Sequence, residues 1–130
     1  MAVGILILSH PGLGSPLVAV AQRLLGGLPL ATEAFEAHWD GDADSLLPAA
    51  SAALRKVDGG DGVLMLVDLY GATPSRLAEK LSRLGTPCQR ISGASLPMLL
   101  RVQNYPEQTL DELCRTAAAG ARNGVVVNDA

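Results

Sequence analysis

The fold of this chain can be inferred from one stretch of its sequence, GVLMLVDLYGATP at residues 62–74. Its centre, Val63–Val67, is apolar at every position, as expected of a strand covered on both faces of a parallel sheet. A loop around Gly71 follows. Thr73 and Pro74 then predict a helix with Thr73 as its N-cap and Pro74 as its first residue. The stretch therefore predicts one strand–loop–helix unit of an α/β protein.

The same order of elements recurs on both sides of this stretch. A second apolar run, Val3–Leu8, is followed by a predicted helix that begins at Ser15-Pro16 and ends at Gly26-Gly27. Alternating side chains predict a half-exposed edge strand at Ala34–Trp39. The remaining predictions are a helix from Asp42 or Asp44 to Val57, a helix from Thr73 to Leu84, a strand at Cys88–Ser92, a helix from Ser95 through Leu100 and a helix at Leu110–Ala121. Such alternation predicts a doubly wound, mostly parallel sheet of four strands with helices on both faces.

Length and composition limit the classes of protein that remain. The 130 residues fit a single domain over residues 1–130, and the net charge of −3 argues against a nucleic-acid binder. The apolar runs are far shorter than the roughly 20 residues that a membrane-spanning helix needs. No secretory signal pattern is visible, and Cys88 and Cys114 form no C-x-x-C pair. We therefore expect a cytoplasmic protein without membrane insertion, whose cysteines are structural thiols.

Two polar residues follow the two most apolar strands. His10 comes after Val3–Leu8, and Asp68 comes directly after Val63–Val67. Parallel strands present their carboxyl ends at one edge of the sheet, where α/β proteins bind their ligands. If the strands are neighbours, the Asp68 carboxylate can accept the Nδ1–H of His10 and leave Nε2 free as a nucleophile or base. Each residue alone is also compatible with an ordinary polar loop position.

The helices that begin at residues 15–16 and 73–74 are expected to point their N-termini at the same edge. Free N–H groups and the positive end of the helix dipole suit an anion such as phosphate. Ordinary capping accounts for these signals equally well. Gly12, Gly14 and Gly71 allow close backbone approach, but neither a complete dinucleotide-binding motif nor a P-loop is present.

The other side chains that could take part in chemistry are predicted to have structural or solvent-exposed positions. His38 is expected in solvent, and Phe35 and Trp39 are expected in the core or an interface. No cluster has the spacing of metal ligands, so we predict neither a metal nor a cofactor. The arginines that could help to hold a phosphate or a partner are Arg76, Arg90 and Arg101.

Three segments in order carry a family resemblance: GILILSH at residues 4–10, the stretch at 62–74, and SGASLPML at residues 92–99. Together they resemble the IIA domain of the mannose-type (mannose/fructose/sorbose) phosphotransferase systems, from the first strand to the C-terminus. The resemblance implies that the residue at His10 accepts a phosphoryl group from the phosphocarrier HPr and passes it to a IIB component. It also implies that Asp68 orients the imidazole.

The resemblance further implies that the Thr73 hydroxyl, with Gly71 and Ala72, binds the phosphoryl group. Ala72 stands where the family commonly has a second glycine. Pro11 and Ser95 likewise replace a common glycine and a common asparagine. Since mannose-type IIA domains pair by exchanging a C-terminal strand, the apolar tail Gly124–Val127 is expected to form an exchanged edge strand of a homodimer.

Two other functions remain compatible with the sequence. A receiver-like signalling domain would be phosphorylated on Asp68 and would need Mg²⁺ held by carboxylates near the end of the first strand, where Ser9-His10 stands instead. A flavodoxin-like phosphate- or nucleotide-binding module would place its ligand near Ser9–Ser15, but the chain has only 3% aromatic residues to flank a flavin. The histidine phosphocarrier is the leading hypothesis, in either sugar transport or a regulatory phosphorelay.

Overall fold

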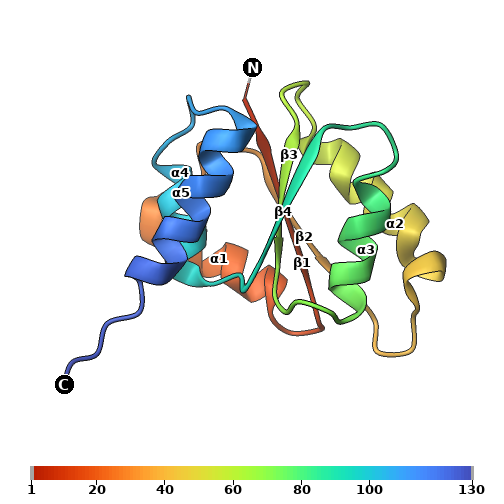
Figure 1. Ribbon diagram of the computed structural model, residues 1–130, viewed down its shortest axis with the longest axis horizontal. Helices are drawn as coiled ribbons and strands as arrows, with labels where there is room; N and C mark the ends of the chain where they lie inside the picture. Colours follow the sequence, from red (N-terminus) through yellow and green to blue (C-terminus); the bar gives the residue numbers. More distant parts are fainter. Residues whose placement is uncertain (1, 130) are drawn as a thin grey trace.

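The computed structural model describes residues 2–129, which form a parallel sheet between two layers of helices (Figure 1). The elements, in chain order, are β1 Gly4–Ser9, α1 Gly14–Leu25, β2 Thr32–Glu36, α2 Ala43–Val57, β3 Val63–Val67, α3 Thr73–Leu81, β4 Cys88–Ser92, α4 Leu96–Gln103 and α5 Leu110–Asn123. The predicted fold class is confirmed: the sheet has four strands, all parallel, in the order β2-β1-β3-β4.

This strand order places a topological switch point between β1 and β3. From β1 the chain passes outward to β2, and it then returns to the other side of β1 to form β3 and β4. The register pairs Leu8 of β1 with Val67 of β3, so the residues after both strands emerge side by side. A crevice at the carboxyl ends of strands is where doubly wound sheets bind ligands.

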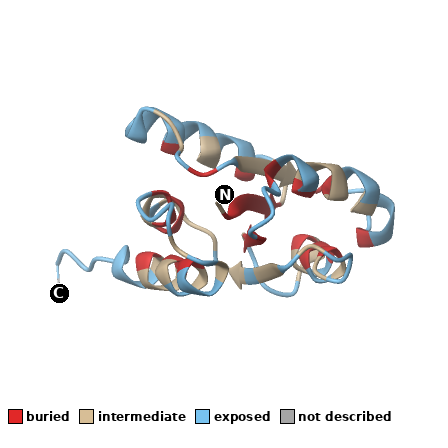
Figure 2. Cartoon of the chain, turned by 90° about the horizontal axis from the view of Figure 1, so that it is seen from above, coloured by how far each residue is buried: buried red, intermediate tan, exposed pale blue. Residues whose placement is uncertain are grey.

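Two apolar clusters hold the helices on the sheet. Alternate residues of β1 and β3, including Ile5 and Leu64, pack under α1, α4 and α5. The intervening residues, including Leu6 and Met65, pack under α2 and α3. Figure 2 shows the buried residues gathered where the helices face the sheet. The two central strands are thus covered on both faces, which explains why their sequences are continuously apolar.

Helix boundaries follow local signals in most places. Gly26 adopts the left-handed conformation that ends α1, and Asp42 caps α2 through a reciprocal pair of bonds with Ser45. Ser95 caps α4, and α5 ends at Asn123. Within residues 2–129, no helix is long and apolar enough to cross a membrane.

Two helix starts differ from the prediction. Helix α1 begins at Gly14 rather than at a Ser15 cap, and Leu13 occupies its N-cap position. Helix α3 begins at Thr73 itself, with Ala72 at the N-cap position, and it ends at Leu81 rather than Leu84. The proline signal located both helices correctly, but it placed the start one or two residues too late.

The predicted edge strand and the predicted tail strand also differ. Strand β2 covers Thr32–Glu36 rather than Ala34–Trp39, because its partner β1 ends at Ser9, which pairs with Glu36. Residues 125–127 form no strand in the described part of the chain; they run away from the body of the molecule with their valines exposed (Figure 1). The exchanged strand of a homodimer therefore stays a prediction.

Candidate functional site

The residues after β1 and β3 form a hydrogen-bonded pair at the switch point. His10 Nδ1 lies 2.7 Å from Asp68 Oδ2, and the His10 backbone N–H donates to the same oxygen at 2.9 Å. A carboxylate only accepts, so this contact requires the proton of a neutral imidazole on Nδ1 and leaves the lone pair on Nε2. The His10 side chain keeps 23% of its surface exposed, against 12% for Asp68. The ring is therefore fixed on one side and accessible to a reactant.

Asp68 is itself held by the sheet. Its backbone N–H donates to the Leu8 carbonyl at 3.1 Å, which continues the β1–β3 pairing by one residue. Its second carboxylate oxygen, Oδ1, is buried and has no hydrogen-bond partner among residues 2–129. The other oxygen, Oδ2, accepts from both the backbone and the ring of His10, so Asp68 is suited to orient that ring.

The N-terminus of α1 is already occupied by an anion of the chain itself. Glu36, the last residue of β2, accepts the Gly12 N–H through Oε1 and the Ser15 N–H through Oε2, both at 2.9 Å. The Gly12 bond, followed by those from Ser15, lowers the pKa of the Glu36 carboxyl below its ordinary value of 4.5. Of the two alternatives left open for this helix end, phosphate binding or ordinary capping, the structure supports capping, with Glu36 as the acceptor.

Glu36 was not singled out from the sequence. It lies 24 residues from Gly12 along the chain, so no local motif joins the two. The usable signal was its position, because an acidic residue at the end of an edge strand next to β1 faces the loop that starts α1. Gly14 completes this junction, since a Cβ there would lie 2.9 Å from the Ser9 hydroxyl.

The N-terminus of α3 is arranged differently. Ala72 occupies the N-cap position, and no side chain in residues 2–129 forms a capping bond there. Arg76 donates to the Gly71 carbonyl and to the Thr73 hydroxyl, both at 3.2 Å. Gly71 has a φ of 87°, a conformation that other residues adopt at a cost. The predicted phosphate-binding residues Gly71, Ala72 and Thr73 thus lie together at an uncapped helix end beside a guanidinium.

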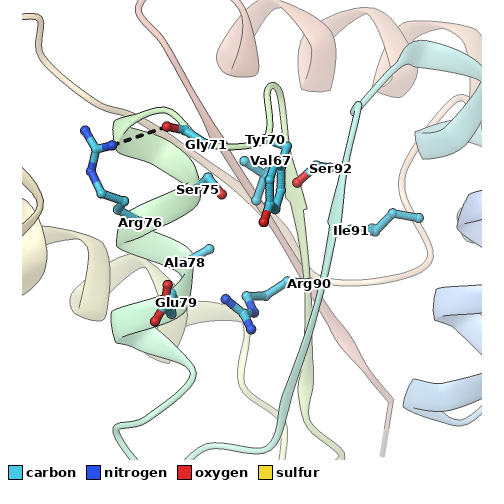
Figure 3. A pocket seen from close by; sticks show the side chains of 10 residues that line it. All are labelled: Val67, Tyr70, Gly71, Ser75, Arg76, Ala78, Glu79, Arg90, Ile91 and Ser92. Atoms are coloured by element: carbon cyan, nitrogen blue, oxygen red, sulfur yellow. Dashed lines mark hydrogen bonds between the residues drawn. The ribbon is translucent and has the colours of Figure 1, made fainter.

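A groove of about 610 Å³ opens beside this helix end, between α3 and the edge strand β4 (Figure 3). Arg76 and Glu79 line it from α3, and Arg90 and Ser92 line it from β4. Neither His10 nor Asp68 belongs to its walls, so the groove adjoins the imidazole–carboxylate pair without containing it.

Trp39 lies over the His10 ring, where sequence analysis did not expect it. The two ring centroids are 5.2 Å apart and the planes are inclined by 30°. Trp39 is 75% exposed, so it does not belong to the core, and the alternative of an interface residue stays a prediction. The half-buried Phe35 does pack against the core. His38 is exposed, as predicted.

The remaining candidates lie away from this pair. The Arg101 side chain packs against Gly120 of α5. Burial raises the pKa of both the Cys88 and the Cys114 thiols, which disfavours reactive thiolates. Across residues 2–129, no three His, Cys, Asp or Glu side chains come together as a metal site. The expectation of metal-free chemistry stays a prediction.

A doubly wound sheet with an imidazole–carboxylate pair at its switch point defines a class of α/β protein whose histidine lies at the ligand-binding edge. Comparison with known families agrees: residues 4–117 match the family described as "PTS system fructose IIA component". The chain therefore belongs to this family, and the resemblance inferred from its three segments is confirmed.

Individual relatives extend the comparison. The chain is 29% identical over 132 residues to the "PTS system mannose-specific EIIAB component" of Escherichia coli strain K12, covering 96% of this chain and 39% of that protein. It is 35% identical over 109 residues to the "Transcriptional regulatory protein LevR" of Bacillus subtilis strain 168, covering 79% of this chain and 11% of that protein. The chain thus spans about two fifths or less of these relatives.

A solved structure supports the fold independently. The "Mannose/sorbose specific IIA subunit of phosphotransferase system from Enterococcus faecalis" superposes with a TM-score of 0.86 at 21% identity, covering 100% of this chain and 97% of that one. At this identity the likeness extends to the fold, and the roles of individual residues must be argued from their own contacts.

Proposed function

We propose that this chain is a histidine phosphocarrier of a sugar phosphotransferase system or a related regulatory phosphorelay. The observation that carries the proposal is the 2.7 Å contact between His10 Nδ1 and Asp68 Oδ2, which directs Nε2 outward at the ligand-binding edge of the sheet. The phosphoryl donor is HPr, the acceptor is a IIB component, and residues 1–130 act as one domain. The cytoplasmic location expected from the sequence is part of this proposal.

Phosphoryl transfer asks a protein mainly for positioning and charge stabilisation. The Nε2 lone pair attacks phosphorus in line with the bond to the donor, and that bond breaks with its electron pair leaving on the donor. Asp68 keeps the proton on Nδ1 throughout, so Nε2 is the only nucleophilic ring atom. Transfer onward to the IIB component is the reverse displacement, with the imidazole as leaving group.

The uncapped end of α3 is the proposed cradle of the phosphoryl oxygens. Its N–H groups and dipole favour an anion, and the Thr73 hydroxyl offers one further donor. Arg76, which contacts Gly71 and Thr73, adds positive charge at the same place. Gly71, Ala72 and Thr73 thus act as the phosphate-binding residues, while His10 and Asp68 are the catalytic pair.

The test is transfer of labelled phosphate from phosphoenolpyruvate through enzyme I and HPr, followed by mapping of the label. The wild type should carry acid-labile, base-stable label on His10. Replacing His10 by alanine should abolish the label, whereas the matched variant His38→Ala should keep it. Label that survives in His10→Ala would overturn the proposal.

The proposal includes a homodimer in which the tail Gly124–Val127 takes part. Three consecutive exposed valines (Val125–Val127) are too few to form a stable strand alone, and addition to a sheet edge would satisfy their backbone groups. Light scattering should show a dimer for the intact chain and a monomer for a version that ends at Asn123. A monomeric intact chain, or a truncated chain that dimerises equally well, would contradict this part of the proposal.

A further inference from the structure

The position of Trp39 is not explained by the core. It is the only tryptophan of the chain, it is 75% exposed, and its ring lies 5.2 Å from that of His10. An indole gains most when it is buried, because it removes a large apolar surface from water. Here it covers a face of one polar ring at the ligand-binding edge instead.

The chain holds this indole in place from both sides. Before it, the Ala37 N–H donates to the Ser9 carbonyl at 2.8 Å, next to His10. After it, the Gly41 N–H donates to the His38 carbonyl at 3.1 Å, and Asp42 caps α2. Trp39 therefore sits in a short turn whose backbone is fixed at both ends, which places its side chain within reach of the His10 ring.

We propose that Trp39 is a positioning residue that stabilises the phosphorylated form of His10. The inference rests on the proposed function. When Nε2 forms its bond to phosphorus, the bond from phosphorus to the donor breaks and Nδ1 keeps its proton. The imidazole then carries a positive charge. Asp68 compensates that charge in the plane of the ring, and the π face of Trp39 attracts it from the side.

The physical effect is a shift of an equilibrium. A cation over an exposed tryptophan is stabilised modestly, which corresponds to about a twofold to fivefold change in the equilibrium constant. Trp39→Leu should lower the equilibrium constant for phosphoryl transfer from HPr to His10 by this factor. Trp39→Phe should lower it less, because phenylalanine keeps a π face. Leu84→Ala, at an exposed apolar residue near the opposite edge of the sheet, is the matched control and should change nothing.

Measuring the equilibrium separates this role from docking. Wild type and variants are mixed with phosphorylated HPr, and the phosphorylated fractions of both proteins are measured once they stop changing. A residue that only helps HPr to dock slows transfer equally in both directions and leaves these fractions unchanged. Unchanged fractions in Trp39→Leu would therefore overturn the inference while leaving label on His10, and with it the proposed function, intact.

A second measurement tests the contact in the unaltered protein. Because Trp39 is the only tryptophan, its emission reports on this site alone. Phosphorylation should change the emission of the wild type and of His38→Ala, and the same treatment of His10→Ala should leave it constant. Constant emission in a fully phosphorylated wild type would contradict the inference.

Discussion

The N-termini of α1 and α3 lie at the same edge of the sheet, yet within the described residues only the N-terminus of α1 has a side chain that accepts its N–H groups. Helix α1 is closed by the Glu36 carboxylate, which accepts the Ser15 N–H of its first turn and the Gly12 N–H of the loop before it. Helix α3 has no capping side chain among residues 2–129, and the Arg76 guanidinium lies beside it. One helix end is thus neutralised by the chain itself, while the other keeps its preference for an incoming anion.

The difference follows from the strands that flank the central pair. Strand β2 lies next to β1 and ends at Glu36, which pairs with Ser9. Strand β4 lies next to β3 and ends at Ser92, which pairs with Val67. A carboxylate thus reaches the first helix, whereas the strand beside the second helix ends without an acidic residue. The acidic residue at the end of β2 therefore leaves the N-terminus of α3, rather than that of α1, as the proposed phosphate site.

The largest effect on phosphoryl transfer is expected at Asp68, which follows β3 and contacts His10 after β1. Asp68→Asn should slow phosphoryl transfer by at least about a hundredfold, because the amide can hold the imidazole in the wrong tautomer. Its circular dichroism spectrum should stay that of the wild type. Rapid-quench measurement of label transfer from HPr checks this, with the exposed Asp61→Asn at the other end of β3 as control. A transfer rate within a few-fold of the wild type would mean that the ring needs no orienting carboxylate.

A substitution of Glu36 tests whether its carboxylate stabilises the N-terminus of α1. Glu36→Gln should lower the free energy of unfolding at pH 7 by about 1 kcal/mol, the usual worth of a helix cap, because an amide offers a single accepting oxygen. Urea unfolding measures this loss, and Glu33→Gln on the same strand should be neutral. An unchanged free energy of unfolding would show that the carboxylate does not stabilise α1.

The pH dependence of this effect has a fixed sign. The folded-state pKa of Glu36 is lowered, so its stabilisation is present above its ordinary pKa of 4.5 and is lost as the pH falls through the lower folded value. The stabilities of wild type and Glu36→Gln should therefore converge as the solution is acidified below pH 4.5. A constant difference between pH 7 and pH 3 would argue against the ionised carboxylate as the cause.

The smallest effect is expected at the uncapped N-terminus of α3, on the rate of phosphoryl transfer. Thr73→Val should slow phosphoryl transfer by several-fold, since it removes about one net hydrogen bond to the phosphoryl oxygens, and it should leave stability nearly unchanged. Thr73→Ser, which keeps the hydroxyl, should restore the rate. A variant Thr73→Val that transfers at the wild-type rate would remove this hydroxyl from the proposed cradle.

The fold was predictable where the sequence signal is local. The continuous apolar runs of β1 and β3 favour strands covered on both faces, and β4 has the predicted bounds, whereas β3 ends at Val67, before Asp68 and Leu69. Strand β2 was displaced by two residues or more, because alternation of side chains continues through Ala37 and Trp39 after pairing with β1 has ended. The pairing partner, not the side-chain pattern, sets the end of an edge strand.

The site was predictable only in part, for a related reason. His10 and Asp68 follow the two buried strands, so topology alone brings them together. Glu36 and Trp39 reach the same place from the end of β2 and the loop after it, and their contacts depend on side-chain directions that no spacing in the sequence records. Capping by a distant residue also explains why α1 starts without a local cap.

The central claim is that His10 accepts phosphate through Nε2 while Asp68 keeps the proton on Nδ1. Nuclear magnetic resonance of the phosphorylated chain, labelled with ¹⁵N in its histidines, tests it most directly through the coupling of phosphorus to a ring nitrogen. The account predicts coupling to Nε2 of His10 and a proton retained on Nδ1. Coupling to Nδ1, or phosphorus on any other residue, would contradict it.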